Sequence, residues 1–268
     1  MKIGLTGSNG FLGSHLKQLI IINNFELVQI SFRDKQDGKL YNSLKLNLKK
    51  IESCDFVINC CAVKNPQNKY DYFINAKLPA MMQRYINRKK LKCKLIHIST
   101  MNVFFKFLDD EYTNQKIKGE KLLQNGFLVV RPGLIWDYNG KGDSKIFKKI
   151  LDIPIPFHFM INSGNIYRPV CANELSKFII NNIKKPQYFD EVNVLGNKIL
   201  SLFQLFKIMA TRMNKIVIPI NSIFLFWLKW IFINKRGFFY TLSQQISKFD
   251  RTADNLNLKN KVYLKFDV

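Results

Sequence analysis

The stretch Thr6-Gly7-Ser8-Asn9-Gly10-Phe11-Leu12-Gly13 lies between a short apolar run, Lys2–Thr6, and an apolar helical pattern over 13–22. Its three glycines have the spacing of a turn that binds the pyrophosphate of a dinucleotide. The first permits a tight turn, the second lets phosphate approach the backbone, and the third lets helix and strand pack closely. The N-terminus of the helix adds free N–H groups and a positive dipole end. The residues predicted to contact the cofactor here are Gly7, Gly10, Phe11, Leu12 and Gly13; a purely structural turn is the alternative.

Short apolar runs alternate with helical patterns along the first half of the chain, which is typical of βαβ units around a parallel sheet. Strands are expected at Lys2–Thr6, Leu27–Phe32, Leu44–Leu48, Phe56–Cys61, Leu95–Ser99, Phe127–Arg131 and Val192–Leu195. Helices are expected at 13–22, 71–89, 112–125 and 173–184, the last with Asn173 as its N-cap. The predicted fold is therefore α/β, a Rossmann-type doubly wound parallel sheet.

The pattern becomes less regular after Arg131, where prolines punctuate loops and short elements. We therefore expect an NAD(P)-binding Rossmann domain over 1–165 and a small C-terminal substrate-binding lobe over 166–268, with a late strand and helix returning to the core. The lobe is expected to lean over the carboxyl ends of the strands, where doubly wound folds bind their ligands. A length of 268 residues suits one large domain or one domain with a small lobe.

Composition excludes several classes of protein. Lys and Arg exceed Asp and Glu by 23 charges, but 47% of the residues are hydrophobic, which excludes a disordered chain. The lysines are scattered, so we expect solvated surfaces and no specific nucleic-acid site; attraction to anionic substrates or an anionic membrane stays open. Five cysteines without a C-x-x-C pair favour a reducing compartment without disulfides. His15, His97 and His158 have no second ligand at metal spacing, so no metal site is expected.

Localisation is expected to be cytoplasmic, because Met1 is not followed by the pattern of a secretory signal. The apolar run Ile223–Ile233 is interrupted by Lys229 and is shorter than the ~20 residues that span a bilayer. The longer stretch Ile216–Ile233 suits a buried or amphipathic helix of the lobe. The alternative is peripheral membrane contact through 222–236, with a substrate sugar on a polyprenyl carrier.

The end of the second strand bears on the choice between NADP and NAD. A carboxylate there would bind the ribose 2′-hydroxyl, whereas an arginine would accommodate a 2′-phosphate. The sequence Ser31-Phe32-Arg33-Asp34 has no acid at its first position and has Arg33 two residues later. This favours NADP, although Asp34 leaves NAD open.

Two further features of the sequence could take part in proton transfer to a substrate. Tyr112 and Lys116 stand four residues apart in a helical pattern, with Glu120 following, so the phenol and the ammonium share one face. A tyrosine with an unperturbed pKa near 10 exchanges protons poorly at pH 7, so a cation that favours phenolate is useful beside it. Thr100 ends a buried strand, where its hydroxyl could bind a substrate oxygen or cap its own backbone.

The glycine turn, the strand-ending Ser-Thr and the Tyr-x-x-x-Lys helix, in this order, resemble the extended short-chain dehydrogenase/reductase family of nucleotide-sugar epimerases, dehydratases and reductases. The resemblance covers most of the chain, and within the family the start of the helix after the fourth strand is similar to the dTDP-4-dehydrorhamnose reductase branch. Further segments that carry it are 54–62, 75–79, 129–133, 167–170 and 173–175.

The resemblance implies a role for each matching residue. Tyr112 would be the acid/base, Lys116 would hold the nicotinamide ribose and tune Tyr112, and Thr100 would position the sugar oxygen. Arg168 would anchor a substrate phosphate, with a structural surface arginine as the alternative. Additional cofactor contacts are expected from Cys61, Ala62, Lys64 and Asn75.

Two departures from the family pattern narrow the reaction. Thr100 and Tyr112 are only 12 positions apart, about half the family's usual separation, so the loop over the substrate is shortened. Met101 and Asn102 stand where dehydratases have an Asp-Glu pair, so dehydration is not expected.

The predicted function is NAD(P)-dependent reduction of a 4-keto sugar on a nucleotide carrier, with Tyr112 as proton donor. A C4 epimerase that keeps its cofactor is one alternative. A dinucleotide-sensing or scaffold protein with weakened catalysis is another. A homodimer that pairs through helices 71–89 and 112–125 is also expected.

Overall fold

The structure, a computed structural model, describes residues 1–32, 40–105, 110–123, 127–161, 165–185, 187, 190–220 and 250–266. These residues form two compact units. Unit 1 comprises Met1–Pro132, Ala172–Val194 and Leu258–Val262, and unit 2 comprises Gly133–Cys171, Leu195–Asn257 and Tyr263–Val268. The sequence predicted one border at 165, whereas residues 133–165 lie in unit 2. Their strands pair and their side chains pack with later parts of unit 2.

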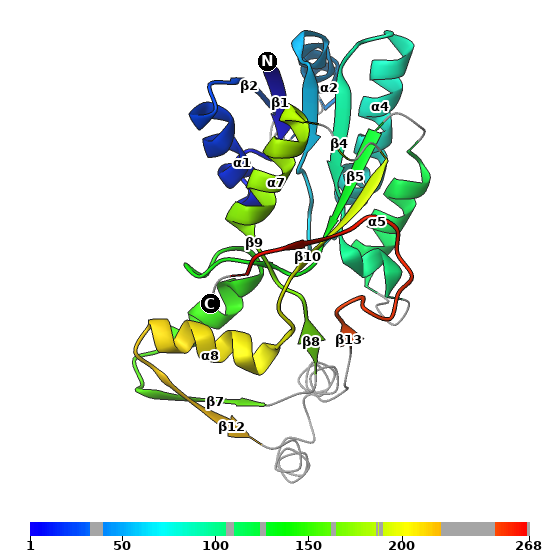
Figure 1. The fold of residues 1–268 in the computed structure, drawn as a ribbon. Coiled ribbons are helices and arrows are strands. Elements are labelled where there is room, and N and C mark those ends of the chain that lie inside the picture. Colours follow the sequence, from blue (N-terminus) through cyan, green and yellow to red (C-terminus); the bar gives the residue numbers. More distant parts are fainter. Residues whose placement is uncertain are drawn as a thin grey trace. The chain divides into compact units, whose positions relative to one another are not determined.

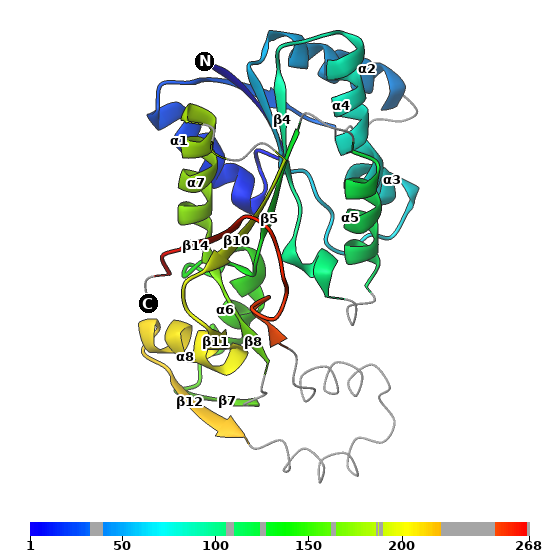
Figure 2. The ribbon, with the colours of Figure 1, turned by 45° about the vertical axis from the view of Figure 1, so that its right-hand side comes forward.

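A seven-stranded sheet with the order β14-β10-β5-β4-β3-β1-β2 forms the centre of unit 1 (Figures 1 and 2). Each pair of neighbours from β10 to β2 is parallel. The bounds are β1 Lys2–Thr6, β2 Glu26–Ile30, β3 Phe56–Asn59, β4 Lys94–Ile98, β5 Phe127–Pro132, β10 Glu191–Gly196 and β14 Lys261–Leu264. The predicted doubly wound parallel sheet is confirmed.

Helices cover both faces of this sheet. Helix α1, Phe11–Ile22, packs with α7, Ala172–Lys184, on one face, and α4, Leu78–Arg88, packs with α5, Glu111–Lys121, on the other (Figure 2). Because β1 lies between β2 and β3, the chain reverses its winding direction at β1. Doubly wound folds bind ligands in the crevice at such a switch point.

The expected strand at Leu44–Leu48 is wrong, because these residues belong to helix α2, Leu40–Lys49, which continues into the 3-10 helix η1, Lys50–Ser53. The alternation of leucine with polar residues indicated a strand. Leu44 and Leu48, however, also lie one helical turn apart, and both pack into the core while Leu46 is exposed.

The expected helix 71–89 is interrupted. It consists of α3, Lys69–Tyr72, a π-helical turn η2, Phe73–Lys77, and α4. Pro79 has no N–H to donate to the carbonyl of Asn75 and its ring crowds that carbonyl, which accounts for the change of winding. Asn173 is not an N-cap either, since α7 already begins at Ala172.

Unit 2 has its own core around Trp136, Phe206 and Phe266. Helix α8, Leu202–Arg212, begins with a capping box in which Ser201 and Gln204 bond each other's backbone N–H groups. The remaining elements are β6 Ile135–Trp136, η4 Gly142–Ser144, α6 Lys145–Leu151, β7 Phe157–Ile161, β8 Ile166–Tyr167, β9 Val170–Cys171, β11 Leu200–Ser201, β12 Ile216–Ile220 and β13 Asp250–Arg251. In the part of the chain that is described, no helix combines the length and apolarity needed to cross a membrane. The segment 222–236 lies outside that part.

The start of α1 depends on Gly13. A Cβ atom on this residue would lie 2.0 Å from the carbonyl oxygen of Gly7, so the helix and the turn can approach each other only without a side chain there. A Cβ on Gly10 would lie 3.0 Å from the same oxygen, a contact that a small shift relieves.

We therefore expect Gly13→Ala to lower the free energy of unfolding by about 3 kcal/mol, the upper part of the range for overpacking. Gly10→Ala, the same change in the same turn, is the control and should cost about 1 kcal/mol or less. Urea denaturation of both variants measures the difference. Equal stabilities would show that the close approach is not a constraint.

Candidate active site

A cavity of about 370 Å³ lies at the carboxyl ends of β1, β2 and β3. Three chain segments and one side chain from η2 line it: Gly7–Gly10, Gln29–Phe32, Cys60–Ala62 and Ile74. Ser8 and Gln29 are joined by a hydrogen bond of 3.0 Å from the serine hydroxyl. The cavity therefore lies at the switch point of the sheet, directly beside the glycine turn.

The glycine turn has the shape that a phosphate cradle requires. Gly7 has φ +66°, and a Cβ atom on it would lie 2.9 Å from the carbonyl oxygen of Cys60. The turn closes through a hydrogen bond of 2.8 Å from Gly10 N to Gly7 O. Gly10 precedes α1 and has no side chain, so it contributes none to cap the N–H groups at the helix start. These N–H groups suit an anionic group of a dinucleotide.

A buried chain of polar groups holds the start of the loop after β3, which lines the cavity through Cys60, Cys61 and Ala62. The Thr6 hydroxyl donates to Asn59 Oδ1 at 2.7 Å, and the backbone N–H of Cys61 approaches both oxygens at 3.3 Å. Since its oxygen accepts these bonds, Asn59 Nδ2 donates to His97 Nδ1 at 3.1 Å. Burial, with the nearby charges of Lys116 and Arg131, holds the pKa of His97 well below its usual value. His97 is therefore neutral.

Asn75 connects the loop after β3 to α5. It is fully buried, its Oδ1 accepts from Val63 N, and its Nδ2 donates to Val63 O and to Gln115 Oε1, all at 2.8 Å. Gln115 directly precedes Lys116. Asn75 was predicted as a cofactor contact, but its amide is used to hold the loop and the helix.

Lys116 lies at the carboxyl end of β4 with only 1% of its surface exposed. Its Nζ donates to the carbonyl oxygen of Ile98 at 2.9 Å and lies 5.9 Å from the centroid of the Tyr112 ring. Burial lowers the pKa of Lys116 to about 8, although the charge of Glu120 opposes the shift. An ammonium group is thus held at the edge of the sheet beside a phenol.

Tyr112 occupies the first turn of α5, where Asp110 caps the helix by accepting from Thr113 N at 2.8 Å. Burial and the charge of Asp110 raise the pKa of Tyr112 to about 12. The direction is opposite to the one predicted from the Tyr/Lys spacing, because burial and the charge of Asp110 both disfavour the phenolate. Tyr112 therefore carries its proton at neutral pH.

Thr100 caps its own backbone, as the alternative reading of the sequence allowed. Its Oγ1 accepts from Asn102 N at 3.2 Å at the start of the 3-10 helix η3, Met101–Phe104. A hydroxyl that accepts one bond still has its hydrogen to donate. Helix α5 packs against η3, so the elements that carry Thr100 and Tyr112 are neighbours.

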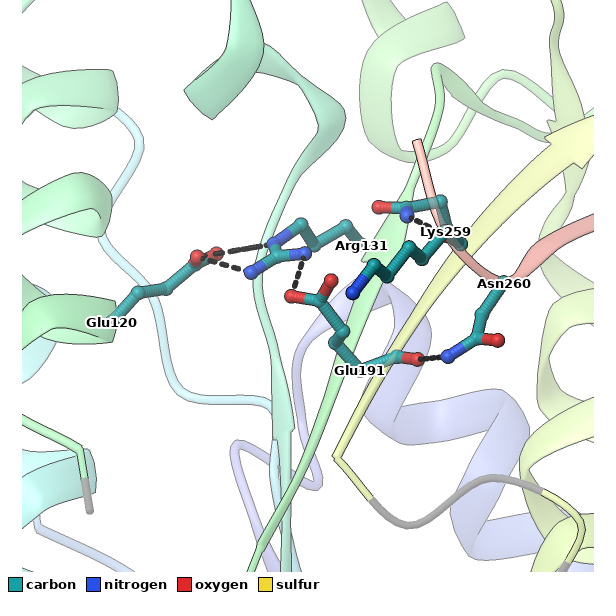
Figure 3. Close-up of polar contacts among 6 residues, drawn as sticks. Glu120, Arg131, Glu191, Lys259 and Asn260 are labelled. Atoms are coloured by element: carbon teal, nitrogen blue, oxygen red, sulfur yellow. Dashed lines mark hydrogen bonds and ion pairs between the residues drawn. The ribbon is translucent and has the colours of Figure 1, made fainter. Parts of the chain in front are cut away.

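An ion-pair network lies beside this group and was not predicted (Figure 3). Arg131 from β5 donates Nε and one terminal nitrogen to Glu120 at 2.8–3.1 Å, and its other terminal nitrogen to Glu191 of β10 at 2.7 Å. Its guanidinium also lies 4.9 Å from the centroid of the Phe104 ring. Glu120 follows Lys116 by one helical turn, so the network fixes the end of α5 to two strands.

Arg168, the predicted phosphate anchor, lies in unit 2. It forms a two-pronged ion pair with Asp254 at 2.8 Å, and its Nη1 donates to the carbonyl oxygens of Gly196 and Asn197 at 3.3 Å. Its guanidinium lies 5.0 Å from the centroid of the Tyr263 ring. The guanidinium thus has structural partners, and a phosphate would have to compete with Asp254.

The remaining predicted residues divide into clear groups. Gly7, Gly10, Cys61 and Ala62 line the cavity. The other predicted cofactor contacts in the described ranges are not among the residues that line it: Phe11, Leu12, Gly13, Lys64, Asn75 and Lys116. Arg33 and the loop residues 106–109 lie outside the described residues. Further residues line the cavity but were not among the predicted cofactor contacts: Ser8, Asn9, Gln29, Ile30, Ser31, Phe32, Cys60 and Ile74. Across the described ranges, no three His, Cys, Asp or Glu side chains gather as a metal site.

The fold and the arrangement of these residues are those of an extended short-chain dehydrogenase/reductase. Residues 1–192 match the family described as the RmlD substrate binding domain, and the chain belongs to this family. The resemblance predicted from the motifs is confirmed.

Comparison with individual proteins agrees with this assignment. The bifunctional polymyxin resistance protein ArnA of Wigglesworthia glossinidia brevipalpis is 24% identical over 82% of the chain, which spans only 38% of that relative. A dTDP-4-dehydrorhamnose reductase from Clostridium acetobutylicum superposes with a TM-score of 0.65 at 19% identity, over 82% of this chain and 84% of that one. The enzyme of the same name from Bacillus anthracis, in complex with NADP, gives 0.66 at 20% identity, over 82% and 84%.

The unequal burial of the two carboxylates of the Arg131 network gives a prediction. The side chain of Glu120 is 14% exposed and that of Glu191 is 39% exposed. We expect Glu120→Gln to cost about 2–3 kcal/mol of unfolding free energy, because it removes the charge that pairs with a buried guanidinium. Glu191→Gln, the matched control, should cost about 1 kcal/mol or less. Chemical denaturation would contradict this ranking if the two variants were equally stable.

Lys116 gives a pH-dependent prediction. The pKa of Lys116 is about 8 in the folded chain against 10.5 for a free lysine. Between pH 8 and pH 10.5 the unfolded chain therefore binds more protons than the folded chain, so the free energy of unfolding rises with pH in this range. The difference corresponds to on the order of 3 kcal/mol.

Lys116→Met should therefore lose this rise. We expect the stability difference between wild type and variant to shift in favour of wild type from pH 7 to pH 10, measured by urea denaturation. Lys118→Met, at an exposed position of the same helix, is the control. A difference that does not change with pH would contradict the buried ammonium.

Proposed function

We propose that this chain is an NAD(P)-dependent oxidoreductase that reduces the 4-keto group of a nucleotide-activated sugar. The observation that carries the proposal is the buried Lys116 ammonium, bound to the end of β4 and 5.9 Å from the ring of a protonated Tyr112, in the unit that also holds the glycine-turn cavity. Solved structures of similar fold include dTDP-4-dehydrorhamnose reductases, one of them with NADP.

The cavity suits a dinucleotide on chemical grounds. Gly7 and Gly10 would hold the pyrophosphate, Cys61 and Ala62 would contact the middle of the cofactor, and Lys116 would bind the nicotinamide ribose. When bound, the cofactor supplies a hydride to the carbonyl carbon of the sugar. NADP is favoured over NAD because the lining residues at the end of β2, Gln29–Phe32, include no carboxylate to accept from a ribose 2′-hydroxyl.

Tyr112 would complete the reduction. As hydride reaches the carbonyl carbon, the carbonyl oxygen gains negative charge and takes the phenolic proton of Tyr112. The ammonium of Lys116 stabilises the phenolate that remains, and the Thr100 hydroxyl donates to the same substrate oxygen to orient it. Protons for the next turnover come from solvent.

The protonated phenol favours reduction over C4 epimerisation. An epimerase begins by removing a proton from a sugar hydroxyl, which needs a phenolate, whereas burial and the charge of Asp110 raise the pKa of Tyr112 to about 12. Met101 and Asn102 provide no acid and base for dehydration. A dinucleotide-binding protein with weakened catalysis would share the cavity but not need the Tyr112 proton.

The nucleotide-sugar substrate would be recognised in part through its phosphate. Arg168 would reach a substrate phosphate if Asp254 released its guanidinium, and the shortened loop after Thr100 would leave the sugar less enclosed. We also propose that the chain forms a homodimer through α4 and α5. A membrane contact is proposed through 222–236.

Removal of the phenolic oxygen tests the proton donor. We expect Tyr112→Phe to lower kcat for reduction of a nucleotide-linked 4-keto sugar by about 10²–10⁴-fold, the contribution of a positioned acid. Oxidation of NADPH followed at 340 nm measures turnover, and fluorescence titration with NADPH measures binding. The Kd of the variant should stay within about threefold, because the phenol is proposed to act on the substrate oxygen, whereas Lys116 is proposed to hold the cofactor.

Tyr72→Phe, on α3 of the same unit, is the matched control and should leave turnover unchanged. Lys116→Met should weaken both cofactor binding and turnover. Wild-type turnover in Tyr112→Phe would remove the proposed proton donor. Binding of NADPH without any turnover across a panel of keto sugars would favour the sensor.

A further inference from the structure

A row of buried polar side chains crosses the sheet of unit 1 from β1 to β4. Thr6, Asn59 and His97 have no exposed surface. Thr6 pairs in register with Asn59, and Asn59 with His97, on parallel neighbouring strands, so the three side chains lie on one face of the sheet. Asn59 is followed directly by Cys60, which lines the cavity. His97, on the next strand, is not among the lining residues.

The orientation of the Asn59 amide decides how the loop after β3 is held. As observed, Oδ1 accepts from the Thr6 hydroxyl at 2.7 Å and from the backbone N–H of Cys61 at 3.3 Å. A turned amide would place the Nδ2 donor against the Cys61 N–H, which is also a donor, so this bond would be lost. Cys61 lines the cavity, so the orientation of the amide bears directly on the cavity wall.

His97 provides the acceptor that selects the observed orientation. Its Nδ1 lies 3.1 Å from Asn59 Nδ2, so Nδ1 must accept there, and the neutral ring carries its hydrogen on Nε2. Within the described residues, this buried Nε2 has no hydrogen-bond partner. A buried N–H without a partner costs free energy. The imidazole is therefore an unfavourable choice at this position unless its acceptor nitrogen is needed.

Two cations keep the ring in the form that accepts. Burial, together with the charges of Lys116 and Arg131, lowers the pKa of His97 well below its usual value. A protonated ring would present an N–H from Nδ1 to the Asn59 donor, so the bond between them would be lost. The ammonium of Lys116 is held by the carbonyl oxygen of Ile98 at 2.9 Å. The Arg131 guanidinium is held by its two carboxylates.

The loop that Asn59 holds lies directly against the glycine turn. A Cβ atom on Gly7 would lie 2.9 Å from the carbonyl oxygen of Cys60 and 3.0 Å from the backbone nitrogen of Cys61. The turn and the loop both line the cavity. A displacement of the loop would therefore change the distance between the two segments that the cofactor would contact.

We propose that His97 is a positioning residue for the dinucleotide cofactor. Its Nδ1 orients the Asn59 amide, and Asn59 in turn holds the backbone of Cys60–Ala62 at the spacing from the glycine turn that the cofactor requires. This role rests on the dinucleotide proposed above for the cavity. It uses His97 as a hydrogen-bond acceptor within the protein, without contact between the ring and the cofactor.

Substitutions that separate the acceptor from the packing test this role. His97→Leu fills most of the space of the ring but has no acceptor, whereas His97→Asn is smaller and can place an amide oxygen where Nδ1 stands. We expect the Kd for NADPH, measured by fluorescence titration, to rise about tenfold in His97→Leu and to stay within about threefold in His97→Asn. His158→Leu, the same change at a buried histidine of unit 2, is the control and should bind NADPH as wild type.

A purely structural role of His97 predicts the reverse ranking, because His97→Asn leaves the larger cavity in the core. Wild-type affinity in His97→Leu, or weaker binding by His97→Asn than by His97→Leu, would overturn the proposal. Thermal unfolding verifies that the variants fold.

NMR of the ring nitrogens tests the wild-type chain without any variant. The chain has three histidines, and we expect His97 to carry its hydrogen on Nε2 from pH 6 to pH 8 in the absence of cofactor. A hydrogen on Nδ1 would show that the Asn59 amide is turned and would overturn the proposal. The expected ranking of NADPH affinities without reduction of any sugar would contradict the proposed reaction and still support this role. A wild type that does not bind NADPH would overturn both.

Discussion

The close approach of α1 to the turn after β1 is the constraint on which the candidate site depends. Gly13 passes so near the carbonyl oxygen of Gly7 that no side chain fits, and a Cβ atom on Gly7 would lie 2.9 Å from the carbonyl oxygen of Cys60 in the loop after β3. These two approaches bring the start of a helix to the point where the sheet reverses its winding direction. The cavity between the turn, the end of β2 and the loop after β3 follows from them. Without the glycines, the helix N-terminus would stand away from the sheet edge.

Buried polar groups then connect this cavity to the helix that carries the proposed chemistry. Asn75 holds the loop after β3 and, through Gln115, the turn of α5 that contains Lys116. The side chain of Lys116 donates to the end of β4. Arg131 of β5 pairs with Glu120 in the last turn of the same helix and with Glu191 of β10, so it joins the helix to both strands (Figure 3). Burying cations in this way costs desolvation free energy, which the ion pairs and the carbonyl contact offset. The position of Tyr112 beside the sheet edge rests on this balance.

Local patterns were sufficient to predict most of unit 1, because its strands are short apolar runs and its glycine turn has a fixed spacing. They failed at 44–48, where the spacing of the leucines fits both the alternation of a strand and one turn of a helix. Only packing against the rest of unit 1 decides between the two. The break at η2 could have been found from Pro79, whose missing N–H disrupts a helix. The roles of Asn75 and Arg131 could not, because their partners Val63, Gln115 and Glu191 lie far away in sequence. For Arg168, the sequence indicated a phosphate and the structure provides a carboxylate, since only the fold brings Asp254 beside it.

Transfer of hydride from the cofactor to the sugar is the central claim, and isotope transfer tests it most directly. The chain would be incubated with NADPH carrying deuterium on the transferred position of the nicotinamide ring and with a nucleotide-linked 4-keto sugar, and the product examined by mass spectrometry and NMR. The account predicts one deuterium on C4 of the sugar for each NADPH oxidised. Bound cofactor with no deuterium in any sugar product would contradict it.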